Sequence, residues 1–69
     1  MAARAHHVVP NHETGGWDVK AEGHLEPIRH FGIKEQAVDF ARDLSRTEHT
    51  ELLIHDKQGR IEERDSYRV

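Results

Sequence analysis

The spacing of apolar residues predicts one amphipathic helix in the middle of the chain. From Ile33 onward, apolar side chains recur every three or four residues, and charged residues fill the positions between them. This stripe consists of Ala37, Phe40, Ala41 and Leu44, with Val38 beside it. We expect the helix to begin after Gly32, a weak N-cap, and to end near Thr47 or Glu48.

Two segments on the N-terminal side of this helix have the pattern of strands. Residues 17–22 (WDVKAE) alternate apolar and charged side chains, which is typical of a strand with one buried face. A shorter extended run, residues 7–9, ends at Pro10 because proline has no N–H to donate to a sheet. Gly15 and Gly16 lie in the turn between these strands. Phosphate-binding loops lead into a helix, whereas this pair leads into a strand, so we interpret both glycines as turn residues.

Apolar residues after the helix predict a second hairpin. A short apolar run and a strand-like segment that begins at Ile61 flank a polar loop with one glycine. The loop length decides the register. A loop with an even number of residues places Ile61 on the same face as Leu52 and Ile54, which gathers the most apolar area. A three-residue loop pairs it with Leu53 and His55 instead.

The order of these elements predicts an α+β domain of two layers with ββαββ topology. One helix covers one face of a mostly antiparallel, four-stranded sheet. The link over residues 23–30 contains Pro27 and forms either a loop or a short edge strand that runs into Phe31. We expect residues 1–5 to be a disordered N-terminus and residues 6–69 to be a single domain. The expected core comprises Trp17, Val19, Ala37, Phe40, Ala41, Leu44, Leu52, Ile54 and Ile61, with Phe31 and Tyr67 covering its ends.

Length and composition limit the class of protein. A domain of 69 residues hides only about 60% of the surface of its unfolded chain, so its stability is expected to be small. No cysteine is present to add disulfides or thiolate zinc sites. Ten basic and 13 acidic residues give a net charge of −3, without the basic excess of a typical duplex binder. No segment approaches the ~20 apolar residues of a membrane span, so we expect a cytoplasmic protein that does not bind membranes.

Four segments together resemble a known bacterial family. They are HVVPN at residues 7–11, GGW with VK at residues 15–20, KEQA with AR and a leucine at residues 34–44, and GRI at residues 59–61. In combination and spacing they are similar to the small family catalogued as domain of unknown function 2188. The resemblance implies a compact α+β domain and implies no activity and no site residues. Ile33 departs from the family, which often has Ser or Thr before the lysine that opens the helix.

The histidines do not have the spacing of a metal site. There are seven of them: His6, His7, His12, His24, His30, His49 and His55. Zinc sites need three or four converging ligands, commonly as closely spaced pairs on one element. Here no cysteine is present and no two histidines lie four residues apart on the predicted helix. We therefore expect surface and turn histidines, with no metal ligands and no cofactor.

The sequence also lacks a convincing catalytic pair. Asp56 is next to His55, and Glu62 is next to Glu63, but neighbours along a strand point to opposite faces. Neither of the two serines lies in the sharp turn that exposes a nucleophile. One helix on one small sheet rarely forms the enclosed pocket that catalysis needs. We therefore expect no catalytic residues and no enzymatic activity.

The sheet face away from the helix is the best candidate for an interaction surface. Leu53 points to this face in the register that gathers the most apolar area, and so must one of the adjacent pair Val8 and Val9. Short sheets also leave edge strands that can pair with another chain. These features predict a non-enzymatic protein-interaction or self-associating module that forms a homodimer through this face or an edge strand.

Weak nucleic-acid binding is the alternative function. Arg60, Arg64 and Arg68 share one face of the last strand, and Lys20 can lie on the same side. Acidic residues interleave with these cations, so we expect at most weak, salt-sensitive contact with RNA or DNA. For both functions, the candidate interaction surface comprises Val8, Lys20, Leu53, Arg60, Arg64 and Arg68.

Overall fold

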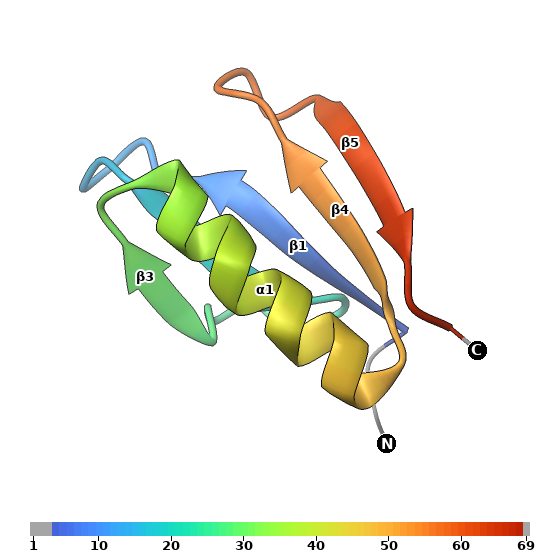
Figure 1. Cartoon of the computed structure of the whole chain (residues 1–69). Coiled ribbons are helices and arrows are strands. Elements are labelled where there is room, and N and C mark those ends of the chain that lie inside the picture. The colour runs from blue at the N-terminus through green and yellow to red at the C-terminus, as the bar shows by residue number, and fades with distance from the viewer. Residues whose placement is uncertain (1–3, 69) are drawn as a thin grey trace.

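The computed structural model of the chain describes residues 4–68 and contains one helix and five strands (Figure 1). In chain order these are β1 (Ala5–Pro10), β2 (Trp17–Ala21), β3 (Arg29–Phe31), α1 (Lys34–Glu48), β4 (Glu51–His55) and β5 (Ile61–Ser66). The first strand begins at Ala5, the last residue of the segment predicted to be disordered, and the Ala5 side chain is buried. Residues 1–3 of that segment lie outside the described residues.

The strands form one mixed sheet in the order β3-β2-β1-β4-β5. The central pair β1–β4 is parallel, and the other neighbouring pairs are antiparallel. The predicted α+β class is confirmed, but the sheet has five strands where four were predicted. Of the two structures expected for residues 23–30, the edge strand is the one that forms. Because α1 carries the chain from β3 across the sheet to β4, the chain re-enters the sheet in the same direction, parallel to β1.

The helix α1 lies across one face of the sheet (Figure 1). It begins after Ile33, whose backbone is extended and whose side chain makes no capping hydrogen bond, so the N-cap is one residue later than the predicted Gly32. The helix ends at Glu48, as predicted. There His49 adopts a left-handed conformation with φ of 58°. Its N–H donates to the Ser45 carbonyl, one of the carbonyl groups at the helix end that would otherwise lack a hydrogen-bond partner.

The core lies between α1 and the sheet. Small helix residues face the sheet, and three of them are completely buried: Ala37, Ala41 and Ser45. The buried apolar cluster comprises Val8, Trp17, Val19, Ala37, Ala41, Leu52 and Ile54, with partly buried Phe31, Val38, Leu44 and Tyr67 packed against it. Most of the predicted core is therefore confirmed. Phe40, Leu44 and Ile61 were also predicted to be buried, and none of the three is.

Ile61 lies outside the core because the second hairpin contains an irregularity. The ladder pairs Ile54 with Glu63. It next pairs His55 with Ile61, which leaves Glu62 as an extra residue in β5. The bulge turns Ile61 away from the helix, and its side chain is 50% exposed. The prediction that Ile61 shares the buried face of Ile54 is therefore wrong, and the register that pairs it with His55 is the one observed.

Ion pairs, and not apolar contacts, connect β5 to the helix. No described residue of β5 belongs to the apolar cluster. Arg42 donates from Nη1 to Asp65 over 2.6 Å and from Nη2 to Glu63 over 2.9 Å. Lys34 donates to Glu62 over 2.6 Å. The outer strand is thus held on its helix side by charge-assisted hydrogen bonds, which are stronger than neutral ones.

Replacing Arg42 with alanine is expected to lower the free energy of unfolding by about 1 kcal/mol, because both carboxylates lose their partner but remain hydrated. The loss should shrink as salt is added. Urea denaturation at two ionic strengths measures it. Arg46→Ala is the matched control, because Arg46 forms one exposed ion pair, with Asp43, and lies 5.7 Å from the Tyr67 ring, and it should change stability by no more than about 0.5 kcal/mol. Equal losses for the two variants would show that the Arg42 contacts do not hold β5.

Candidate functional site

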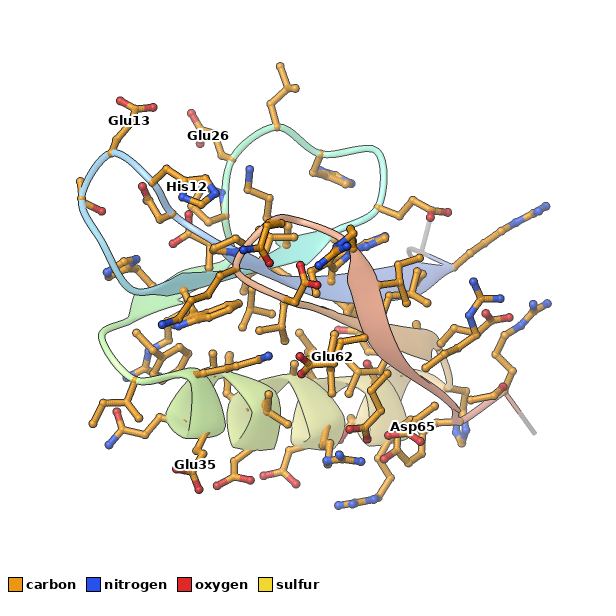
Figure 2. The ribbon with its side chains drawn as sticks, turned by 90° about the horizontal axis from the view of Figure 1, so that it is seen from above. His12, Glu13, Glu26, Glu35, Glu62 and Asp65 are labelled. Carbon is orange, nitrogen blue, oxygen red and sulfur yellow. The ribbon has the colours of Figure 1, made fainter. Side chains whose placement is uncertain are left out.

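The sheet face opposite α1, called the open face below, carries a row of side chains across four strands. Cross-strand partners lie on the same face of a sheet. His7 on β1 is the partner of Lys20 on β2 and of Leu53 on β4, and Leu53 is the partner of Arg64 on β5. Val8, Val19, Leu52 and Ile54 are next to His7, Lys20 and Leu53 in the chain and belong to the core under the helix, so the row points the other way. In Figure 2 the loop residue Glu26 lies on this side of the sheet, away from the helix.

Three of the predicted interaction residues therefore share one row: Lys20, Leu53 and Arg64. Among residues 4–68, neither Lys20 nor Arg64 forms an ion pair, so neither charge is neutralised by a carboxylate in contact with it. Leu53 is only 8% exposed, so it adds little apolar surface. The open face is thus more polar than the sequence suggested.

The other three predicted interaction residues lie elsewhere. Val8 is completely buried in the core, so its assignment to an interaction surface is wrong, and Val9 is the valine that points to the open face. Arg60 lies before β5 in the turn, where its Nε is 3.2 Å from a carboxylate oxygen of Asp56. Arg68 follows β5 and pairs with a carboxylate of β4 at 3.2 Å. The three arginines therefore do not form one basic face.

Two histidines meet on the open face although they are 48 residues apart in the chain. His7 Nδ1 lies 3.0 Å from His55 Nε2. The other ring nitrogens also have partners: His7 Nε2 is 3.3 Å from Glu22 Oε1, and His55 Nδ1 is 2.9 Å from the carbonyl oxygen of Gly59. The parallel β1–β4 pairing brings these rings together, and the residue spacing gave no indication of that pairing.

A third histidine on this face is held by a buried carboxylate. Asp18 is 6% exposed, and its Oδ1 lies 2.6 Å from His30 Nδ1. The side-chain amide of Asn11 donates to the other oxygen over 3.1 Å. Both oxygens of the buried carboxylate are therefore satisfied, as burial of a charge requires. The pair fixes the direction of the His30 ring, which lies beside Gly16.

His6 is buried at the junction of β1, α1 and β4. It is 1% exposed, and its Nδ1 lies 2.8 Å from the Thr50 hydroxyl and 3.4 Å from the Ser45 hydroxyl. Burial lowers the pKa of His6 below its usual value, the Glu48 carboxylate at 3.6 Å opposes that change, and His7 adds slightly to it. The folded protein therefore favours the neutral imidazole.

We expect acid to destabilise the protein through His6. As the pH falls below 6.5, the ordinary pKa, the unfolded chain binds this proton before the folded chain does. The stabilising contribution is complete above that pH and is lost progressively down to the lowered pKa. Urea denaturation between pH 7.5 and pH 5 measures the slope, with the pH values chosen around the usual histidine pKa of about 6.5. His6→Gln should flatten it, whereas His12→Gln in an exposed turn should not. An unchanged slope in His6→Gln would refute this role.

A groove lies between the edge strand β3 and α1 and is called the β3 groove below. It encloses about 420 Å³ and is lined by Arg29, Phe31, Phe40, Asp43, Leu44 and Thr47. The rings of Phe31 and Phe40 are 5.5 Å apart, and the Arg29 guanidinium carbon lies 5.2 Å and 5.4 Å from their centroids. The floor is therefore aromatic, with one cation above it.

Several exposed apolar side chains are close to β3 in the sequence. Among residues 4–68 the most exposed large apolar side chains are those of Leu25 (92%), Ile28 (47%), Ile33 (55%) and Ile61 (50%). Three of these flank β3 along the chain. Phe40, predicted to be buried, belongs to the same region, because it is half-buried at the mouth of the β3 groove. Large apolar side chains are thus exposed on both sides of the edge strand β3 along the chain.

In the part of the chain that the structure describes, no three histidine, cysteine or carboxylate side chains converge as the ligands of a metal ion do. No helix within residues 4–68 has the length and apolar character to cross a membrane. The geometry therefore contains two surfaces for further consideration, the polar open face and the apolar β3 groove.

Comparison with known proteins identifies the family. The family model described as an uncharacterized protein conserved in bacteria (DUF2188) matches residues 6–67. The chain belongs to this family. The DUF2188 match covers the helix and all of the strands except the first residue of β1, which confirms the resemblance recognised in the sequence. No curated protein and no solved structure matches the chain.

Proposed function

We propose that the protein is a non-enzymatic interaction module that forms a homodimer through the edge of β3 and the β3 groove. One observation carries this proposal: three of the four most exposed large apolar side chains among residues 4–68 flank β3 along the chain, and in that part of the chain no strand pairs with the outer side of β3. A free strand edge offers backbone hydrogen bonds, and an adjacent apolar groove offers surface to bury. Both gains are available to a second copy of the chain.

The sequence of β3 suits pairing with itself. In a two-fold antiparallel arrangement centred on His30, each Arg29 lies opposite the partner's Phe31. Within one chain the Arg29 guanidinium already contacts aromatic rings, so the pairing extends a contact that the protein uses. In such a pair, the helix-covered faces of the two sheets point to the same side. The two grooves therefore lie side by side, and their aromatic floors become continuous.

The opposite edge strand, β5, is poorly suited to the same pairing. Its charged residues Glu63, Arg64 and Asp65 follow one another at the exposed edge. Centring a two-fold pair on any of these three sets like charges directly opposite each other, which destabilises a sheet. Charges on edge strands are a common protection against pairing. The two edges of this sheet are therefore unequal, and β3 is the one that favours association.

Sedimentation velocity tests the proposal. The protein is expected to be dimeric at high micromolar concentration, and Phe40→Glu should return it to a monomer because the charge enters the buried groove. Ile61→Glu is the matched control, since Ile61 is an apolar side chain, 50% exposed, on the far edge strand, and it should leave the dimer intact. A clean monomer for the parent protein would refute homodimer formation. Loss of the dimer in Ile61→Glu alone would place the interface on β5.

A second function, weak nucleic-acid binding, is favoured by the unpaired cations Lys20 and Arg64 in one row of the open face. Their strands are separated by two others, so they can contact separate phosphates. In fluorescence anisotropy with a short RNA at low salt, we expect weak binding that Lys20→Ala/Arg64→Ala removes. Added salt should also abolish it. Absence of binding at low salt would eliminate this function.

A further inference from the structure

The hydrogen-bond partners of His7 and His55 fix where the ring hydrogens lie. The carbonyl oxygen of Gly59 only accepts, so His55 Nδ1 carries a hydrogen and donates it. The ionised carboxylate of Glu22 also only accepts, so His7 Nε2 carries one in the same way. In neutral rings, the two remaining nitrogens, His7 Nδ1 and His55 Nε2, then both have lone pairs.

These two lone-pair nitrogens are 3.0 Å apart. With no hydrogen between them they repel each other, and a cation between them removes the repulsion. Metal-binding histidines have this arrangement: the outer nitrogen donates to a carboxylate or a backbone carbonyl, and the inner nitrogen binds the ion. We propose that His7 and His55 bind one divalent transition-metal ion on the open face, with solvent completing its coordination.

The separation of the nitrogens indicates the kind of ion. With metal–nitrogen bonds of about 2.0–2.1 Å, a separation of 3.0 Å corresponds to an angle at the metal of roughly 90–100°. That angle fits neighbouring positions of a square-planar or octahedral ion better than the tetrahedral geometry of structural zinc. Imidazole ligands in such geometry favour Cu²⁺ or Ni²⁺. Two protein ligands in place of four imply modest affinity, and within residues 4–68 no third ligand of the required kind converges on the pair.

The charged residues around the histidine pair have opposing effects on cation binding. Lys20 on β2 lies opposite His7 and disfavours a cation, whereas Glu22 contacts His7 and offsets that charge. Leu53, the partner of His7 on β4, is apolar and almost buried, so it adds no charge beside the rings. This site is independent of the proposed β3 interface, which lies at the sheet edge.

Calorimetric titration of the untagged protein with CuCl₂ and NiCl₂ near neutral pH tests the site. We expect one equivalent to bind, with tenfold or greater loss of affinity in His55→Gln and about tenfold loss in Glu22→Gln, the usual size of an outer-partner effect of about 10–100-fold. His12→Gln controls for surface histidines and should bind as the parent does. Circular dichroism verifies that each variant is folded.

Electron paramagnetic resonance of the Cu²⁺ complex gives a second readout that does not depend on the measured affinity. Hyperfine splitting from two imidazole nitrogens is expected, and from one in His55→Gln. The proposal is overturned if His55→Gln binds as tightly as the parent, or if the parent binds no more metal than the double variant His7→Gln/His55→Gln.

Discussion

Replacing Trp17 with alanine is expected to reduce the free energy of unfolding by about 3–5 kcal/mol, the usual cost of emptying a large buried aromatic site. Trp17 opens β2, is 9% exposed, and lies in the core with the Lys34 ammonium 4.7 Å from its ring centroid. A domain of this size has a total stability of only several kcal/mol. The variant should therefore be largely unfolded at 25 °C, as circular dichroism and urea denaturation can show.

Phe40→Ala is the matched control for this result. The sequence placed Phe40 beside Trp17 in the core, but its ring is half-buried at the β3 groove and lies outside the buried cluster. Since only part of the ring leaves water on folding, we expect a loss of about 1–2 kcal/mol. Similar losses for the two variants would show that the boundary of the core is misplaced.

Gly16→Ala is expected to destabilise the protein by about 2–4 kcal/mol for two reasons. Gly16 has φ of +77°, which costs other residues roughly 1–2 kcal/mol. A β-carbon at this position also meets the backbone carbonyl oxygen of Phe31 at 2.5 Å and the His30 ring at 2.9 Å. The carbonyl belongs to the neighbouring strand, so relief of the clash must displace β3. Thermal or urea denaturation measures the loss.

Gly15→Ala separates the two contributions. Gly15 has a similar φ of +80°, and an added β-carbon there has no neighbour within 4 Å. It should therefore cost only the conformational part, roughly 1–2 kcal/mol. If the two alanine variants are equally stable, the close approach of β3 to the turn does not occur. The double glycine thus combines a flexible turn with a contact that admits no side chain.

The helix and the buried strand face were predictable because each depends on local periodicity. The apolar stripe that contains Ala37 and Ala41 has a spacing that places its residues on one face only in a helix. The alternation from Trp17 to Ala21 places its apolar residues on one face only in a strand. The errors concern residues whose environment depends on distant parts of the chain. Phe40 belongs to the apolar stripe, yet it lies at the sheet edge, where no strand within residues 4–68 lies beyond β3 to cover it.

The candidate surfaces were less predictable because they depend on pairing between strands. One bulge at Glu62 turns Ile61 to the open face, and the loop sequence contains no residue that predicts such a bulge. The choice between Val8 and Val9 depended on a register that pattern alone left undecided. The contact of His7 with His55 required the parallel pairing of strands that are far apart in the chain.

The most direct test of the β3 interface is disulfide formation by His30→Cys. The chain has no cysteine, and a two-fold axis through His30 places this residue opposite its copy, at about 4.5–5.5 Å between Cα atoms. That separation permits a disulfide. Arg64→Cys on β5 serves as the control for the opposite edge. We expect mild oxidation to convert His30→Cys quantitatively to a covalent dimer while Arg64→Cys stays monomeric; a monomeric His30→Cys, or faster dimerisation of Arg64→Cys, would contradict association through β3.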